Sequence, residues 1–132
     1  MTPAEAREAL LFHSALHPDI DDPRWENGFL GSLRPFKGLR EENFHEVMAA
    51  LRVLAEPLQA DQVPREVVSS LVNICHLGRA WGLEPGGMLR RNGLIGDADI
   101  ERLDDWICTI SYAFFCVLDG DVDEAFHEYD RR

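Results

Sequence analysis

The sequence predicts an all-α fold, in which four to six helices form a compact single-domain bundle around a central apolar helix in the C-terminal half. Three observations lead to this prediction. Apolar residues recur every three or four positions along several segments, no segment alternates polar and apolar residues as a strand does, and prolines and glycines stand where these segments would start or stop. The length of 132 residues suits one domain, residues 1–132, with a core of its own.

The first helix is predicted to begin at a capping box. Thr2 can accept from an orphan amide, Pro3 suits the first helical position, and Glu5 can reach back to the cap. Pro18 restricts the residue before it, so this helix is expected to run as far as His17. Residues 19–40 are rich in proline, glycine and scattered aromatics, which predicts an irregular, partly helical strap held to the core by its aromatic side chains.

Two further amphipathic helices are predicted in the middle of the chain. One begins at Glu41 and closes near Pro57. The next begins at Pro64 and carries small residues that permit close helix contacts. It is expected to end at Gly82, because glycine readily takes the left-handed backbone conformation that terminates a helix. The glycine-rich residues 82–96 predict a loop, with a short turn of helix at residues 88–91.

The predicted central helix starts at Asp97, which can cap it, and follows an unbroken apolar pattern. The pattern consists of Ile100, Leu103, Ile107, Ile110, Phe114 and Val117. The second half of this helix is apolar nearly all round, which is typical of a helix wrapped by its neighbours, whereas the acidic residues of its first turns face solvent.

The segment after this helix resembles a calcium-binding loop in its spacing of aspartates. From Asp119 the places one, three, five and twelve are all aspartate, but the sixth place is Glu124 instead of glycine and the twelfth is Asp130 instead of glutamate. We therefore interpret the segment as a helix junction, in which Gly120 ends one helix and Asp121 caps a short last one.

Charge is distributed unevenly along the chain. The formal net charge is −11, and residues 97–130 contain eleven carboxylates against the single cation Arg102. The negative electric field of these charges repels nucleic acid and favours a basic partner. The alternative interpretation is a solvated face that only keeps the protein in solution. The candidate partner-binding residues are Asp99, Glu101, Asp104, Asp105, Asp121, Asp123 and Glu124.

The best candidate metal ligands are His13, His17 and Asp19. Two histidines four residues apart on one helix can reach one ion, and carboxylates follow directly. This pattern supports a second hypothesis, a metal-binding protein or small metal-dependent enzyme. No HExxH or paired CxxC motif accompanies it, and the aspartates equally suit a turn.

No catalytic set can be identified. Cys75 and His76 are neighbours and therefore point in different directions on a helix, and the three cysteines are interpreted as buried thiols. Gly86, Gly87 and the following arginines 90 and 91 form a weak candidate anion cradle. No cofactor is predicted.

A protein-interaction module is the function that these observations favour, for example an inhibitor or immunity-type protein that neutralises a basic partner. We expect a cytoplasmic location, because neither a signal peptide nor an apolar run of bilayer length is visible, and we expect neither nucleic-acid nor membrane binding. A third alternative is a homodimer that completes the burial of apolar helix faces.

Overall fold

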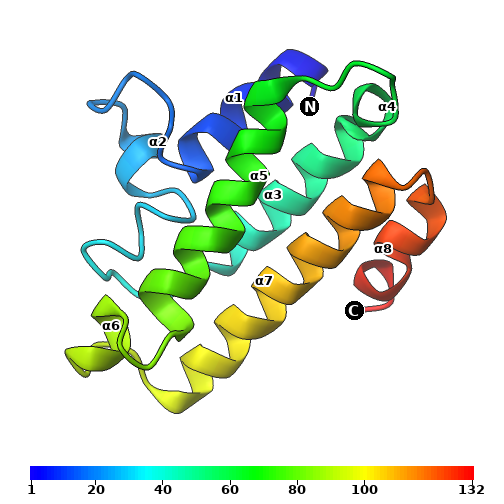
Figure 1. Cartoon of the computed structure of the whole chain (residues 1–132). Helices are drawn as coiled ribbons and strands as arrows, with labels where there is room; N and C mark the ends of the chain where they lie inside the picture. Colours follow the sequence, from blue (N-terminus) through cyan, green and yellow to red (C-terminus); the bar gives the residue numbers. More distant parts are fainter.

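The computed structural model describes residues 1–132 and shows an all-α fold without a β-sheet (Figure 1). Five helices have nine residues or more: α1 (Pro3–His13), α3 (Glu41–Val53), α5 (Arg65–Gly78), α7 (Asp97–Leu118) and α8 (Val122–Asp130). The shorter segments are α2 (Pro23–Glu26), α4 (Ala55–Leu58), the π-helical turn η1 (Arg79–Leu83) and α6 (Met88–Arg91). The predicted fold class and number of main helices are confirmed.

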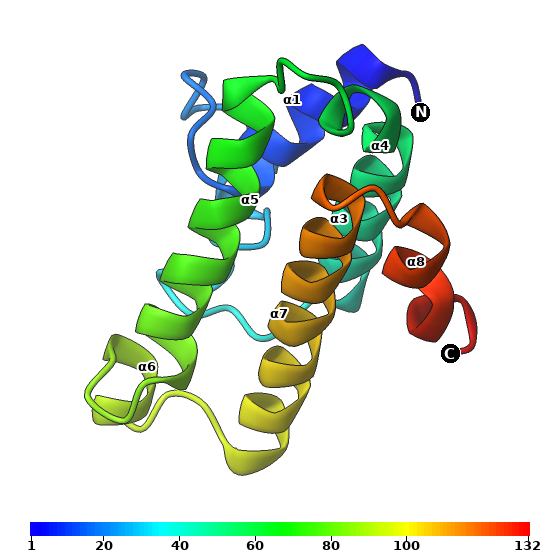
Figure 2. The ribbon, with the colours of Figure 1, turned by 45° about the vertical axis from the view of Figure 1, so that its right-hand side comes forward.

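The central position of α7 is also confirmed, because it packs against α3, α4, α5, η1 and α8. Figure 2 shows α7 between α5 on one side and α8 on the other. The expectation that other helices wrap its second half completely is wrong: Ile107 and Ile110 are fully buried, but Phe115 is exposed. Neighbouring helices therefore leave the side of α7 around Phe115 largely open.

One hydrophobic core of 28 buried residues draws on all five main helices. At its centre the indole of Trp106 in α7 stacks on the ring of Phe44 in α3, with 5.5 Å between ring centroids. Phe29, from the strap between α1 and α3, meets the same indole edge-on. These contacts join α7, α3 and the strap, and confirm that aromatic residues hold the strap to the core.

The start of α1 is as predicted, but its end is not. The Thr2 hydroxyl accepts from the Glu5 amide at 3.1 Å, and the Glu5 carboxylate accepts from the Thr2 amide at 3.0 Å. The helix ends at His13, however, because Ala15 takes a left-handed conformation with φ of 58° and the amides that follow fold back to the carbonyl of Leu11. His17 therefore lies beyond the helix.

Small residues allow close approach of the α5–η1 segment to α7, as predicted. A Cβ atom added at Gly78 would lie 2.7 Å from Ile107 Cδ1, and one added at Gly82 would also overlap α7, at Leu103. Gly82 is buried inside the π-helical turn and has no left-handed conformation, so its predicted role as a terminator is wrong. The chain leaves the helix after Leu83 instead.

The segment between α7 and α8 is a helix junction, as predicted. Gly120 has φ of 87°, and the Asp121 carboxylate caps α8 by accepting from the Glu124 amide at 3.1 Å. The helix α7 begins at Asp97, with Gly96 instead of Asp97 at the cap position. None of the helices combines the length and apolar composition that are needed to span a bilayer.

Candidate functional site

Ion pairs divide the eleven carboxylates of residues 97–130 into two groups. Five have a cationic partner: Asp99 with Arg102, Asp104 with Arg79, Asp105 with Arg132, Glu128 with Arg131, and Asp130 with Arg52. Six are exposed and have no ion-pair partner: Asp97, Glu101, Asp119, Asp121, Asp123 and Glu124. Five of the eleven negative charges expected from the sequence are therefore neutralised, three of them by arginines distant in the chain, namely Arg52, Arg79 and Arg132.

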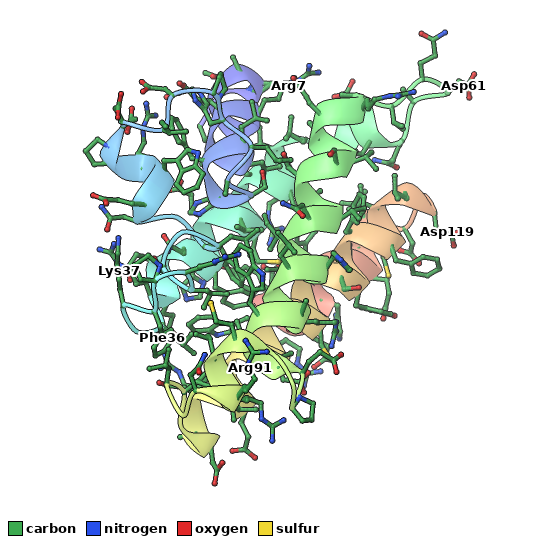
Figure 3. The ribbon with its side chains drawn as sticks, turned by 60° about the vertical axis from the view of Figure 1, so that its left-hand side comes forward. Arg7, Phe36, Lys37, Asp61, Arg91 and Asp119 are labelled. Atoms are coloured by element: carbon green, nitrogen blue, oxygen red, sulfur yellow. The ribbon has the colours of Figure 1, made fainter.

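Four of the six unpaired carboxylates gather at the α7–α8 turn, and we call Asp119, Asp121, Asp123 and Glu124 the acidic corner. Two of them have structural contacts: Asp121 caps α8, and Glu124 accepts from the Tyr112 hydroxyl at 2.8 Å. Their position also suits the positive end of the α8 dipole. Asp119 and Asp123 have no side-chain hydrogen bond, and Figure 3 shows Asp119 at the edge of the molecule, at the end of α7.

The predicted partner-binding residues are not equally available. Asp105 makes two hydrogen bonds to Arg132, at 2.7 and 2.9 Å, which hold the pKa of its carboxyl below the usual range and fasten the C-terminus to α7. Among the seven predicted residues, only Glu101 and Asp123 have side chains that make neither a hydrogen bond nor an ion pair. The sequence gives no direct sign of the pairings of Asp104 and Asp105, because Arg79 lies 25 residues from Asp104 and Arg132 lies 27 residues from Asp105.

An apolar groove of about 420 Å³ lies between α5 and α7, beside the acidic corner. Its lining residues are Leu71, Val72, Cys75, His76, Arg79, Ser111, Phe114, Phe115 and Leu118. Three large apolar side chains at the groove are well exposed: Phe115 by 59%, Val72 by 53% and Leu118 by 42%. Clustered apolar side chains with a polar rim are typical of a binding surface. The sequence does contain a signal for this groove, because the second half of α7 has more apolar residues than one buried helix face requires.

The two ends of the groove differ in charge. At one end Asp119 follows Leu118 directly, and the acidic corner begins. At the other end the guanidinium of Arg79 lies 3.6 Å from the carboxylate of Asp104 and donates to the sulfur of Cys108. The cation at this end is thus neutralised, while the carboxylate at the opposite end is free.

The cysteines do not form a reactive site. Only Cys116 is buried; Cys75 is half-buried in the groove and Cys108 is exposed, so the prediction of three buried thiols is wrong. Burial raises the pKa of the Cys75 thiol to about 11, which keeps it protonated near neutral pH. Its neighbour His76 makes no hydrogen bond to it. Cys75 packs in the groove wall and is not prepared for nucleophilic attack.

His13 is buried at the base of a polar cleft of about 610 Å³ lined by α1, the strap and α3. Its Nδ1 accepts from the Phe29 amide at 3.0 Å, so Nε2 carries the proton and donates to the Glu46 carboxylate at 3.0 Å. The hydrogen bond from His13 lowers the pKa of Glu46. Both ring nitrogens are therefore engaged in tying the strap and α3 to α1.

The structure does not bring His13, His17 and Asp19 together as ligands of one ion. The early end of α1 takes His17 off the helical face, where its ring stacks on Phe12 with 3.8 Å between centroids. Its Nδ1 accepts from the Asp19 amide at 3.0 Å, as expected for a turn. No group of three or more histidine, cysteine, aspartate or glutamate residues has the geometry of a metal site.

The loop with glycines 86 and 87 is built around a structural contact. Arg90 donates to the carbonyl of Leu83 at 2.9 Å, which fastens α6 to η1. Gly87 packs against backbone carbonyls of η1 so closely that a side chain there would overlap them. Arg90 is exposed, but its guanidinium is engaged with the Leu83 carbonyl, so the weak prediction of an anion cradle gains no support.

No family model, curated protein or solved structure matches this chain.

Proposed function

We propose that this chain is a cytoplasmic protein-interaction module, of the inhibitor or immunity type, that uses the acidic corner to bind a basic partner protein. One observation carries the proposal: exposed, unpaired carboxylates gather directly beside exposed apolar side chains of α7. Carboxylates without internal partners can steer a basic protein and pair with its lysines and arginines.

The position of these charges favours binding over a role in solubility alone. Charges that only keep a protein in solution work equally well anywhere on its surface. Here the side chain of Asp119 stays free directly after Leu118, and that of Asp123 stays free in the first turn of α8. Five of the other nine carboxylates of the segment are paired. A polar rim around apolar contact residues is the usual composition of a protein interface.

Charge reversal at the two free carboxylates tests this proposal. We expect Asp119→Lys with Asp123→Lys to fold normally, because both side chains are exposed and neither makes a hydrogen bond or an ion pair in the structure. We also expect this variant to recover at least about tenfold less of a basic protein than the parent in affinity capture from an extract of the source cell, since charge-pair losses commonly exceed about 1.4 kcal/mol at an interface.

The matched control is Asp21→Lys with Glu84→Lys. Both residues are exposed and free of ion pairs. Asp21 lies just before α2 and Glu84 just before α6, and Figure 1 shows both of these helices on the opposite side of the molecule from α8. This variant has the same net charge as the corner variant and is expected to capture the partner like the parent. Equal capture by both double variants would contradict the proposal, because the position of the reversed charges would then make no difference to binding.

A further inference from the structure

We infer that the α5–α7 groove receives an amphipathic helix of the basic partner, with apolar side chains on one face and lysines or arginines beside them. This inference rests on the proposed function and adds the form of the ligand. It follows from the shape of the groove, from the exposure of its apolar residues and from the charges around it.

The shape of the groove suits a helix. α5 and α7 pack side by side, with Leu71 and Phe114 buried between the exposed Val72 and Phe115. Along α7 the lining runs from Ser111 to Leu118, which is about 10 Å at 1.5 Å per residue, or about two helical turns. Two turns present apolar anchors at positions i, i+3 or i+4, and i+7, as in other complexes that place a helix in a groove.

The charges around the groove select a basic helix. Asp119 is free at one end, and the hydrogen bond from Tyr112 places the Glu124 carboxylate beside the exposed face of α7. At the other end Asp104 already neutralises Arg79. Lysines or arginines that flank the apolar face of a bound helix would therefore meet carboxylates near the acidic corner. At the opposite end they would meet no unpaired cation, because Arg79 is already paired with Asp104.

A second copy of this chain is a poor occupant of the groove. Each copy has a formal net charge of −11, so two acidic corners would repel one another. None of the five main helices carries more than one arginine or lysine, so none supplies a basic amphipathic face. The occupant is a different, basic protein.

A designed peptide tests the inference before the partner is known. The probe is an amphipathic helix of about 14 residues, or about four turns, with leucines on one face and lysines on the other. It is titrated into isotopically labelled protein at low salt and followed by amide chemical shifts. We expect saturable shifts that are concentrated at Val72, Cys75, Phe115 and Leu118. A peptide of the same composition in scrambled order should bind at least about tenfold more weakly.

Two variants make the test specific to the groove. Val72→Thr with Phe115→Ser should weaken binding at least about tenfold, because it removes exposed anchors without touching the core. The control, Ile20→Ser with Leu94→Ser, removes two exposed apolar side chains outside the groove and should change the dissociation constant by less than about twofold. Thermal melting of each variant verifies that it is folded.

The outcomes separate this inference from the proposed function. If Asp119→Lys with Asp123→Lys weakens peptide binding and the groove variant does not, the acidic corner stands and the groove inference is overturned. If only the groove variant weakens binding, the helix-binding groove is supported and the role of the acidic corner is overturned. If neither weakens it, both fail. A parent that elutes as a dimer in size-exclusion chromatography, and that Phe115→Ser converts to a monomer, would assign the groove to a second copy and overturn the inference.

Discussion

Replacing Trp106 with alanine is expected to lower the free energy of unfolding by about 3 to 5 kcal/mol, enough to unfold much of a marginally stable protein. The indole is only 4% exposed and joins three parts of the fold. It stacks on Phe44 of α3 and meets Phe29 of the strap edge-on. Removing it leaves a cavity where α7, α3 and the strap meet. Urea unfolding monitored by circular dichroism measures the loss.

Phe115→Ala, on the same helix, is the control for this prediction. Its ring is exposed, so the substitution is expected to change the free energy of unfolding by less than about 0.5 kcal/mol. The two variants thus test which side of α7 faces the core. Equal losses for Trp106→Ala and Phe115→Ala would contradict the orientation of α7 described above.

Replacing His13 with alanine has the second largest expected effect, a loss of about 2 to 4 kcal/mol in the free energy of unfolding. The substitution removes a buried ring and leaves the Phe29 amide without an acceptor and the Glu46 carboxylate without its donor. His13→Gln should lose less, because an amide can both accept and donate. Thermal and urea unfolding of both variants check this order.

The same contact has a consequence for acid stability. The hydrogen bond from His13 lowers the pKa of Glu46 from its ordinary value of 4.5, so the contact stabilises the fold above that value and is lost as pH falls through the lowered value. The contribution is modest because Glu46 is half exposed. His13→Ala should flatten this part of the stability profile below pH 4.5.

A His13→Ala variant whose free energy of unfolding lies within about 1 kcal/mol of the parent value would contradict the structural role given to this histidine.

Local chemistry in the sequence was sufficient to predict much of the fold. The capping box at Thr2 and the junction at Gly120 and Asp121 act within a few residues, so their signals are present in short segments. The apolar pattern of α7 likewise identified its buried face, because one face of a long helix must pack in a small protein.

Features that depend on distant contacts could not be predicted. The end of α1 follows from the left-handed Ala15 and from the amide of Phe29, which holds His13 from another part of the chain. Arg132 neutralises Asp105 across 27 positions. The exposure of Phe115 depends on the positions of α5 and α8, because sequence periodicity shows which residues are apolar but not which side of a helix its neighbours leave open.

The most direct test of the central claim is the salt dependence of association between this protein and the captured basic partner, measured by stopped flow. Exposed charges act over about 8 to 10 Å near physiological ionic strength, so the rate constant for the parent should fall at least about tenfold between about 20 and 500 mM salt. Asp119→Lys with Asp123→Lys should start from a lower rate and show a much weaker dependence on salt. Identical rates and identical salt dependence for parent and variant would contradict the claim that the acidic corner binds the partner.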